Sequence, residues 1–117
     1  MDERERMRAG LAEKAMGWTL LVDYDDFYGY GEPSWFWMGR IQYPQSQWDP
    51  FYSWEQCGRV VEAMRAKGWR LELDANTDCV EAVFYLGNDT RGYAALYDTV
   101  PEAVSVAACC ALEATDD

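Results

Sequence analysis

The segment EAMRAKGW, Glu62–Trp69, echoes an earlier segment, AEKAMGW, Ala12–Trp18, and these two segments decide how the chain is divided. Each brings alanine, charged residues and methionine to a Gly-Trp pair. A glycine commonly ends a helix because it adopts the left-handed backbone conformation without a side-chain clash. The residue after that glycine commonly packs back on the last helical turn. The two pairs therefore predict two helix ends, each followed by a tryptophan that leads the chain into a strand.

Two helices are expected to lead up to these ends. Met7, Leu11 and Ala15 recur at four-residue steps, which predicts a first helix over about residues 2–16. Ser53 and Gln56 have the spacing of a capping box, which predicts a second helix over about residues 54–67. Its inward-facing apolar stripe is predicted to consist of Trp54, Cys57, Val61 and Met64, with Tyr52 packed on Cys57 as a hydrophobic staple.

A third helix is predicted over about residues 100–114, near the end of the printed sequence. Thr99 and Glu102 have capping-box spacing, and Pro101 suits the first turn of a helix. The body of this helix, AVSVAACCALEA, is rich in alanine and cysteine. Because small side chains allow a close approach, this helix is expected to pack tightly on a sheet.

Strand-like patterns fill the intervals between the predicted helices. Three runs over about residues 69–98 are separated by the turn-rich segments ANTD and GNDTRG, which favours an antiparallel meander. Two earlier strands, WTLLVDY and WFWMGRIQY, fall in an aromatic-rich region over about residues 18–52. The predicted fold is a single α+β domain over residues 1–117, in the order α-β-β-α-β-β-β-α, with a mainly antiparallel sheet covered by helices.

Four short motifs in this order resemble those of the phage ABA-sandwich domain family, small proteins encoded mostly by phages and prophages. The resemblance spans nearly the whole chain, and it implies layers of sheet and helices, a viral source and no established catalytic residues. The aromatic region around Tyr24–Tyr43 departs from the family pattern. The matching residues are Ala12, Glu13, Met16, Gly17 and Trp18, then Pro50, Tyr52 and Ser53, then Gly68 and Trp69, and finally Thr99, Pro101 and Ala103.

The charge balance restricts the partners that this chain is expected to bind. It has 21 acidic and 10 basic residues, a formal net charge of −11, and such a surface repels nucleic acid phosphates and anionic membranes. No run of about 18 apolar residues is present, so no membrane span is predicted. We therefore expect a cytoplasmic protein that contacts neither nucleic acid nor membrane directly.

The residue types present give little support to catalysis or to a metal centre. Histidine, the usual general base near neutral pH, is absent, and the four cysteines have no zinc-ligand spacing, so they are interpreted as core residues. The acidic segment DYDDFYGYGE lacks the spacing of an EF-hand and is interpreted as a solvated turn. We predict no enzymatic activity, no cofactor and no metal.

Aromatic residues gather between Tyr24 and Trp54, which hold 12 of the 18 in the chain. One interpretation is that the large rings complete the core. The other is that some of them form an exposed binding surface, because aromatic residues are enriched at interfaces. The sequence leaves both interpretations open.

The favoured functional hypothesis combines the acidic charge with these aromatic residues. It is a non-enzymatic phage-encoded accessory protein that binds a basic or nucleic-acid-binding host protein, as an anti-defence (anti-CRISPR-like) inhibitor that mimics nucleic acid. Two alternatives are a binder that sequesters a nucleotide signal by stacking on Trp35 or Trp37, and a homo-oligomeric structural phage protein. The candidate binding residues are Asp23, Asp25, Asp26, Tyr28, Tyr30, Glu32, Trp35, Trp37, Trp48 and Asp49.

Overall fold

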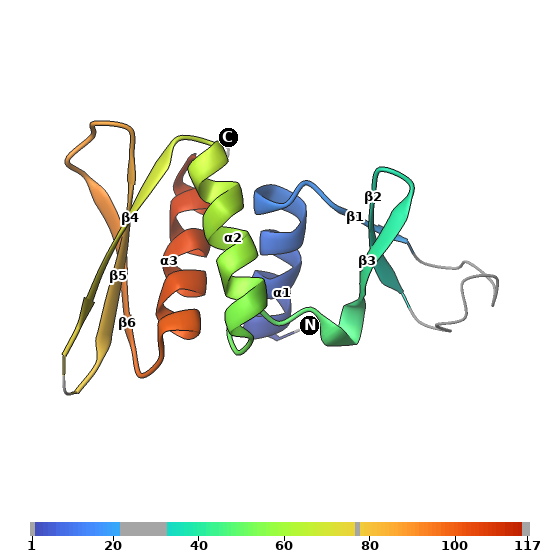
Figure 1. The fold of residues 1–117 in the computed structure, drawn as a ribbon, viewed down its shortest axis with the longest axis horizontal. Helices are drawn as coiled ribbons and strands as arrows, with labels where there is room; N and C mark the ends of the chain where they lie inside the picture. Colours follow the sequence, from blue (N-terminus) through green and yellow to red (C-terminus); the bar gives the residue numbers. More distant parts are fainter. Residues whose placement is uncertain (1, 22–32, 77, 116–117) are drawn as a thin grey trace.

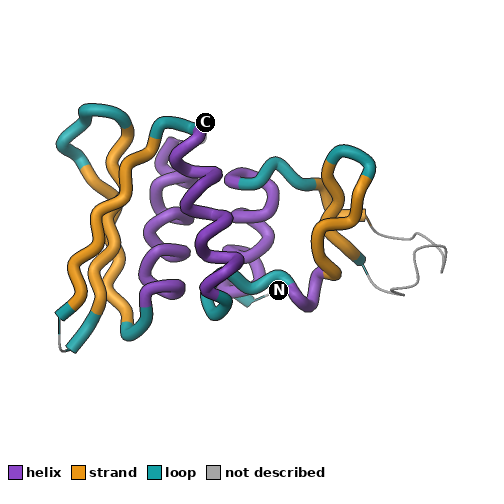
Figure 2. Tube along the Cα trace, in the orientation of Figure 1, coloured by secondary structure: helices purple, strands orange, loops and turns teal. Residues whose placement is uncertain are grey.

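The structure, a computed structural model, describes residues 2–21, 33–76 and 78–115. It measures 47 × 30 × 23 Å, and along its long axis three helices lie between two small sheets (Figures 1 and 2). The elements are α1 (Glu3–Gly10), a π-helical segment (Leu11–Ala15), β1 (Thr19–Leu21), β2 (Ser34–Trp37), β3 (Arg40–Pro44), a 3-10 helix (Gln45–Gln47), α2 (Trp54–Ala66), β4 (Trp69–Ala75), β5 (Val80–Leu86), β6 (Gly92–Tyr97) and α3 (Val100–Thr115).

The described strands form two separate antiparallel sheets, ordered β1-β2-β3 and β4-β5-β6. The α+β class and the order of the helices are confirmed. The segment expected as one strand over residues 35–43 is instead a hairpin, because Met38 (φ 50°) and Gly39 (φ 82°) form its two-residue turn. Positive φ at both turn residues matches the right-handed twist of the flanking strands.

Both Gly-Trp pairs end helices, as the sequence predicts. Gly17 has φ 75° and Gly68 has φ 96°, and the tryptophans that follow them, Trp18 and Trp69, are buried in the core. The Trp18 backbone N–H donates to the carbonyl of Ala12 at 2.9 Å, which closes the first helical stretch. The two tryptophans then lead into β1 and β4.

Gly68→Ala is expected to lower the free energy of unfolding by about 1–2 kcal/mol, because an alanine at positive φ is strained. The new Cβ would meet no atom closer than the Leu86 Cδ1 at 3.8 Å, so the cost comes from the backbone alone. Gly58→Ala is the matched control: Gly58 lies inside α2 in open space, where alanine is expected to stabilise by about 0.5–1 kcal/mol. Chemical denaturation measures the stability of both variants. A Gly68→Ala variant as stable as wild type would contradict this account.

Helix α3 lies between the β4–β6 sheet on one side and α2 and α1 on the other (Figure 1). Nearly every side chain from Pro101 to Leu112 is buried, the exposed exception being Cys110. Its alanines and cysteines therefore permit close packing on both sides, where the sequence predicted it only against a sheet. None of the helices in the described part of the chain is long and apolar enough to cross a membrane.

An aromatic cluster joins the β1–β3 sheet to the helices. The rings of Trp18, Tyr43 and Trp48 lie 4.8–5.9 Å apart between centroids. The Arg59 guanidinium of α2 lies 5.6 Å from the ring centroids of Trp18 and Tyr43 and donates to the Tyr43 hydroxyl at 3.2 Å. Trp48 also donates its indole N–H to the carbonyl of Arg8 in α1 at 2.9 Å.

A candidate acidic–aromatic binding site at the start of α2

The ten predicted binding residues do not come together in the structure. Trp35 and Trp48 are each 1% exposed, so they belong to the core, and their assignment to a binding surface is corrected. Trp37 is 47% exposed and is the last residue of β2. Asp49 lies near α1, where its carboxylate pairs with Arg8. The remaining six, Asp23, Asp25, Asp26, Tyr28, Tyr30 and Glu32, lie outside the described residues.

The most exposed aromatic side chains of the described residues flank the start of α2. Tyr52 is 84% exposed and Trp54 is 67% exposed, although the sequence predicted both to pack inward. The buried residues of α2 are Gln56, Cys57, Val60 and Met64, so Cys57 and Met64 are buried as predicted. Because Asp49 and Glu55 lie on either side of the two rings along the chain, we call Asp49, Tyr52, Trp54 and Glu55 the acidic–aromatic site.

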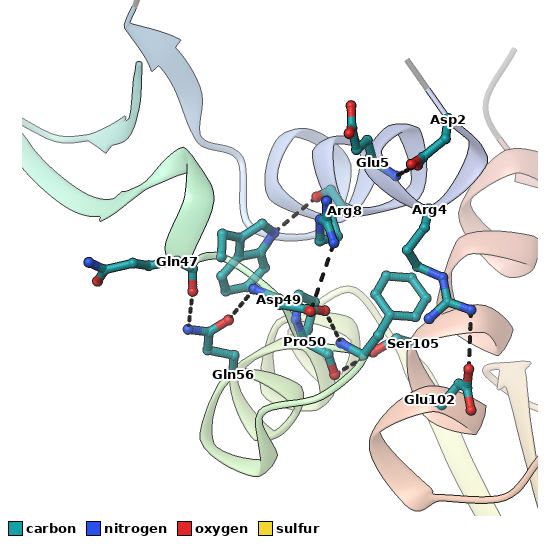
Figure 3. A network of polar contacts seen from close by, with 12 residues as sticks. Asp2, Arg4, Glu5, Arg8, Gln47, Asp49, Pro50, Gln56, Glu102 and Ser105 are labelled. Atoms are coloured by element: carbon teal, nitrogen blue, oxygen red, sulfur yellow. Dashed lines mark hydrogen bonds and ion pairs between the residues drawn. The ribbon is translucent and has the colours of Figure 1, made fainter. Parts of the chain in front are cut away.

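The side chain of Gln56 fixes the segment that carries the site (Figure 3). Its carbonyl oxygen accepts from the backbone N–H of Asp49, and its amide nitrogen donates to the carbonyl of Gln47 at 2.8 Å. Its own backbone N–H donates to the Ser53 hydroxyl at 3.2 Å, which caps α2. The capping-box residues are therefore correctly predicted, but Gln56 extends to the preceding loop instead of the N–H of Ser53.

Asp49 organises the turn between the 3-10 helix and α2. Its carboxylate accepts from the Phe51 N–H at 3.1 Å, and its carbonyl accepts from the N–H groups of Tyr52 and Ser53. Arg8 of α1 pairs with the same carboxylate at 3.8 Å (Figure 3). Asp49 is thus a structural residue whose side chain remains 41% exposed, and it adds negative charge beside Tyr52.

Two contacts from α1 and α3 hold the same turn on its buried side. The Ser105 hydroxyl of α3 donates to the carbonyl of Pro50 at 2.8 Å, in a fully buried position. The Arg4 guanidinium of α1 lies 4.4 Å from the centroid of the Phe51 ring and pairs with Glu102 at 3.1 Å. The turn is therefore fixed from three helices, while Tyr52 and Trp54 project away from the core.

The thiols offer no activated nucleophile near this site. Burial raises the pKa of Cys57 to about 11, and burial, with the Glu113 charge second, raises the pKa of Cys109 to about 12. Burial and Glu113 also raise the pKa of Cys110, which is exposed. These thiols are protonated at neutral pH, whereas thiolates are the reactive form. Within residues 2–21, 33–76 and 78–115, no three side chains of metal-ligand type gather where they could hold an ion.

A pocket of about 380 Å³ opens between α1 and the segment after β3, beside Arg8. Its walls include Trp35 and Trp48, but both rings are 1% exposed, so neither offers a face on which a nucleotide base could stack. Trp35 is therefore excluded as the stacking residue of a nucleotide binder. Comparison of this chain with protein-family models, with curated proteins and with solved structures finds no match.

Proposed function

We propose that this chain is a non-enzymatic, phage-encoded accessory protein that binds a basic host protein through the acidic–aromatic site. The observation that carries the proposal is the exposure of Tyr52 and Trp54 on a turn fixed by buried hydrogen bonds. Tyrosine and tryptophan are enriched among the few residues that contribute most of the binding energy at protein interfaces.

The fixed turn also favours affinity. Binding loses free energy when flexible groups become ordered at an interface. Here the backbone from Asp49 to Gln56 is already held by Gln47, Ser53 and Ser105, so most of that ordering has occurred before a partner arrives. The two aromatic side chains are then the principal groups that still lose freedom on binding.

The acidic charge favours a basic partner. The chain has a net charge of −11, and Glu55 adds negative charge at the site itself, where the carboxylate of Asp49 pairs with Arg8. Such a surface attracts proteins that bind nucleic acid, because their binding pockets are positively charged. Asp23, Asp25, Asp26 and Glu32, which the sequence predicted as binding residues, contribute to the net negative charge of the chain. This reasoning, with the phage origin implied by the family resemblance, supports the proposal of a nucleic-acid-mimicking anti-defence inhibitor that acts in the cytoplasm of the host.

The test is capture of a partner by the full-length protein from host lysate, followed by affinity measurement with the purified, identified partner. Tyr52→Ala and Trp54→Ala are each expected to raise the dissociation constant by roughly thirtyfold, which corresponds to about 2 kcal/mol. Higher ionic strength is expected to weaken binding, since the partner is basic. Trp37→Ala is the control, because Trp37 is an exposed tryptophan that lies on β2, outside the acidic–aromatic site.

Two results would contradict the proposal. If Trp37→Ala abolished binding while the α2 variants retained it, the binding surface would lie on the β1–β3 sheet. If binding of the purified partner were unchanged by salt and by both aromatic substitutions, neither the charge nor the rings would contribute. Thermal unfolding of each variant should match wild type, because the side chains removed are exposed.

A further inference from the structure

The two edges of the β4–β6 sheet differ sharply in charge. Strand β4, one edge of the described sheet, carries the exposed charged residues Arg70, Glu72 and Asp74. Strand β6, the other edge, has the sequence GYAALY and carries no charged residue. Natural edge strands commonly bear charges, prolines or bulges that prevent pairing with another chain. By this criterion β4 is built as an edge, whereas β6 has the composition of a central strand.

The outer face of the same sheet shows the same gradient. One cross-strand row runs from Glu72 through Val83 to Ala94, and the next runs from Asp74 through Glu81 to Leu96. Each row is acidic at β4 and apolar at β6, where Ala94 is exposed and Leu96 is 58% exposed. The uncharged part of the sheet is therefore at its margin, where the backbone N–H and C=O groups of β6 have no strand beside them among the described residues.

We propose that β6 pairs antiparallel with β6 of a second copy, so that the two sheets form one six-stranded sheet. The occupant is a second copy because this arrangement corrects the charge gradient on both sides at once. The uncharged strands would become central, and the charged β4 strands would form both outer edges. Three strands are also close to the smallest sheet that is stable, so extension gains backbone hydrogen bonds as well as apolar contact.

A two-fold axis at Ala95 gives a register with complementary side chains. Residues directly opposite each other in an antiparallel pair lie on the same face. This axis would place Tyr93 opposite Tyr97 of the second copy on the helix side, and Ala94 opposite Leu96 of the second copy on the outer face. Aromatic pairs and apolar pairs across strands each stabilise a sheet. Leu96, now exposed, would gain an apolar neighbour.

The surface beside this edge carries charges of both signs, so it does not repel the same surface of a second copy. A groove of about 590 Å³ lies next to Tyr97, between α1 and α3. Its charged walls come from Arg4 and Arg6, and from Glu3 and Glu113, so both signs are present. The net charge of −11 on each chain still repels the second copy at long range, and salt is therefore expected to strengthen the dimer.

The test is the molar mass of the full-length protein by light scattering and analytical ultracentrifugation over a wide concentration range. The expected result is a species of twice the 13.5 kDa of one chain. Leu96→Lys is expected to raise the dimer dissociation constant by at least about tenfold, because it places a charge on the paired strand. Leu73→Lys is the matched control: Leu73 is a leucine on the opposite edge, β4, and is 49% exposed. It should leave the mass unchanged.

Hydrogen exchange locates the contact. Backbone amides of β6 are expected to exchange more slowly at concentrations where the dimer is populated, and those of β4 are not. A protein that remains monomeric at every concentration would overturn the proposal. A dimer that Leu96→Lys leaves intact, or that protects β4 in place of β6, would also overturn it. Folding of Leu96→Lys is verified by circular dichroism, and its lysine would face Glu81 across the strand pair.

Discussion

Trp48→Ala is expected to lower the free energy of unfolding by about 3–5 kcal/mol, the range found for large aromatic residues removed from cores. Trp48 is 1% exposed, and its ring lies 4.8 Å from that of Trp18 and 5.5 Å from that of Tyr43. Its indole N–H also holds the carbonyl of Arg8. The substitution therefore removes the centre of the cluster through which the β1–β3 sheet contacts the helices.

Two further variants separate the parts of this effect. Trp48→Phe keeps an aromatic ring but leaves the Arg8 carbonyl without its donor, so a smaller loss of about 1–3 kcal/mol is expected. Trp54→Ala removes a tryptophan that is 67% exposed, and a change within about 0.5 kcal/mol is expected. Urea denaturation followed by circular dichroism measures all three. Equal losses for Trp48→Ala and Trp54→Ala would show that the burial assigned to these residues is wrong.

These tryptophans also show where sequence reasoning fails. Trp35 and Trp37 lie two residues apart on one strand, yet one is buried and the other is half exposed. Residues two apart on a strand point to the same face, so alternation does not explain this difference. Trp37 is the last residue of β2, beside the turn at Met38 and Gly39, and the sequence alone does not say how far along the strand the packing extends. That depends on contacts between segments far apart in the chain, such as the hydrogen bond from Trp48 to Arg8. The aromatic-rich region was therefore open to two interpretations.

Local signals were sufficient for the helix ends and for the fold class. Gly17 and Gly68 end helical stretches because glycine, which has no Cβ, adopts a positive φ without strain. The capping residue Ser53 likewise acts within one helical turn. The two-residue turn at Met38 and Gly39 was not predicted, because methionine is uncommon at positive φ. The division into two sheets was not predicted either, since strand order depends on long-range packing.

The acidic–aromatic site was predicted only in part. Asp49 was among the candidate residues, whereas Tyr52 and Trp54 were assigned to the interior. Trp54 lies three residues before Cys57 and so shares its helical face, and no sequence signal separates the two residues. What differs is that Trp54 is the first residue of α2, whereas the buried residues of this helix begin at Gln56. Each of the four cysteines was interpreted as a core residue, but only Cys57 and Cys109 are buried.

The stability of the protein is expected to fall steeply at alkaline pH because of Cys109. This thiol is 5% exposed, and it donates to the carbonyl of Met7 at 3.7 Å, so it joins α3 to α1. Burial, with a smaller contribution from Glu113, raises its pKa from 9.0 to about 12 in the folded protein. Above pH 9.0 the unfolded chain releases this proton while the folded chain keeps it. The stabilisation is therefore complete below that pH and is lost as the pH rises toward 12.

The loss from this one group is expected to approach about 1.4 kcal/mol for each pH unit in that interval. Cys109→Ala removes the titrating group, so its free energy of unfolding should fall less steeply with pH than that of wild type. Cys110→Ala is the matched control, since Cys110 is the exposed neighbour and its substitution should preserve the steep dependence. Both slopes come from denaturant unfolding at a series of alkaline pH values under reducing conditions. Because wild type and Cys109→Ala share every other titrating side chain, the difference between these two slopes isolates the Cys109 thiol. If Cys109→Ala and wild type had equal slopes, Cys109 would ionise with the same ease in the folded and unfolded states, and burial would not raise its pKa.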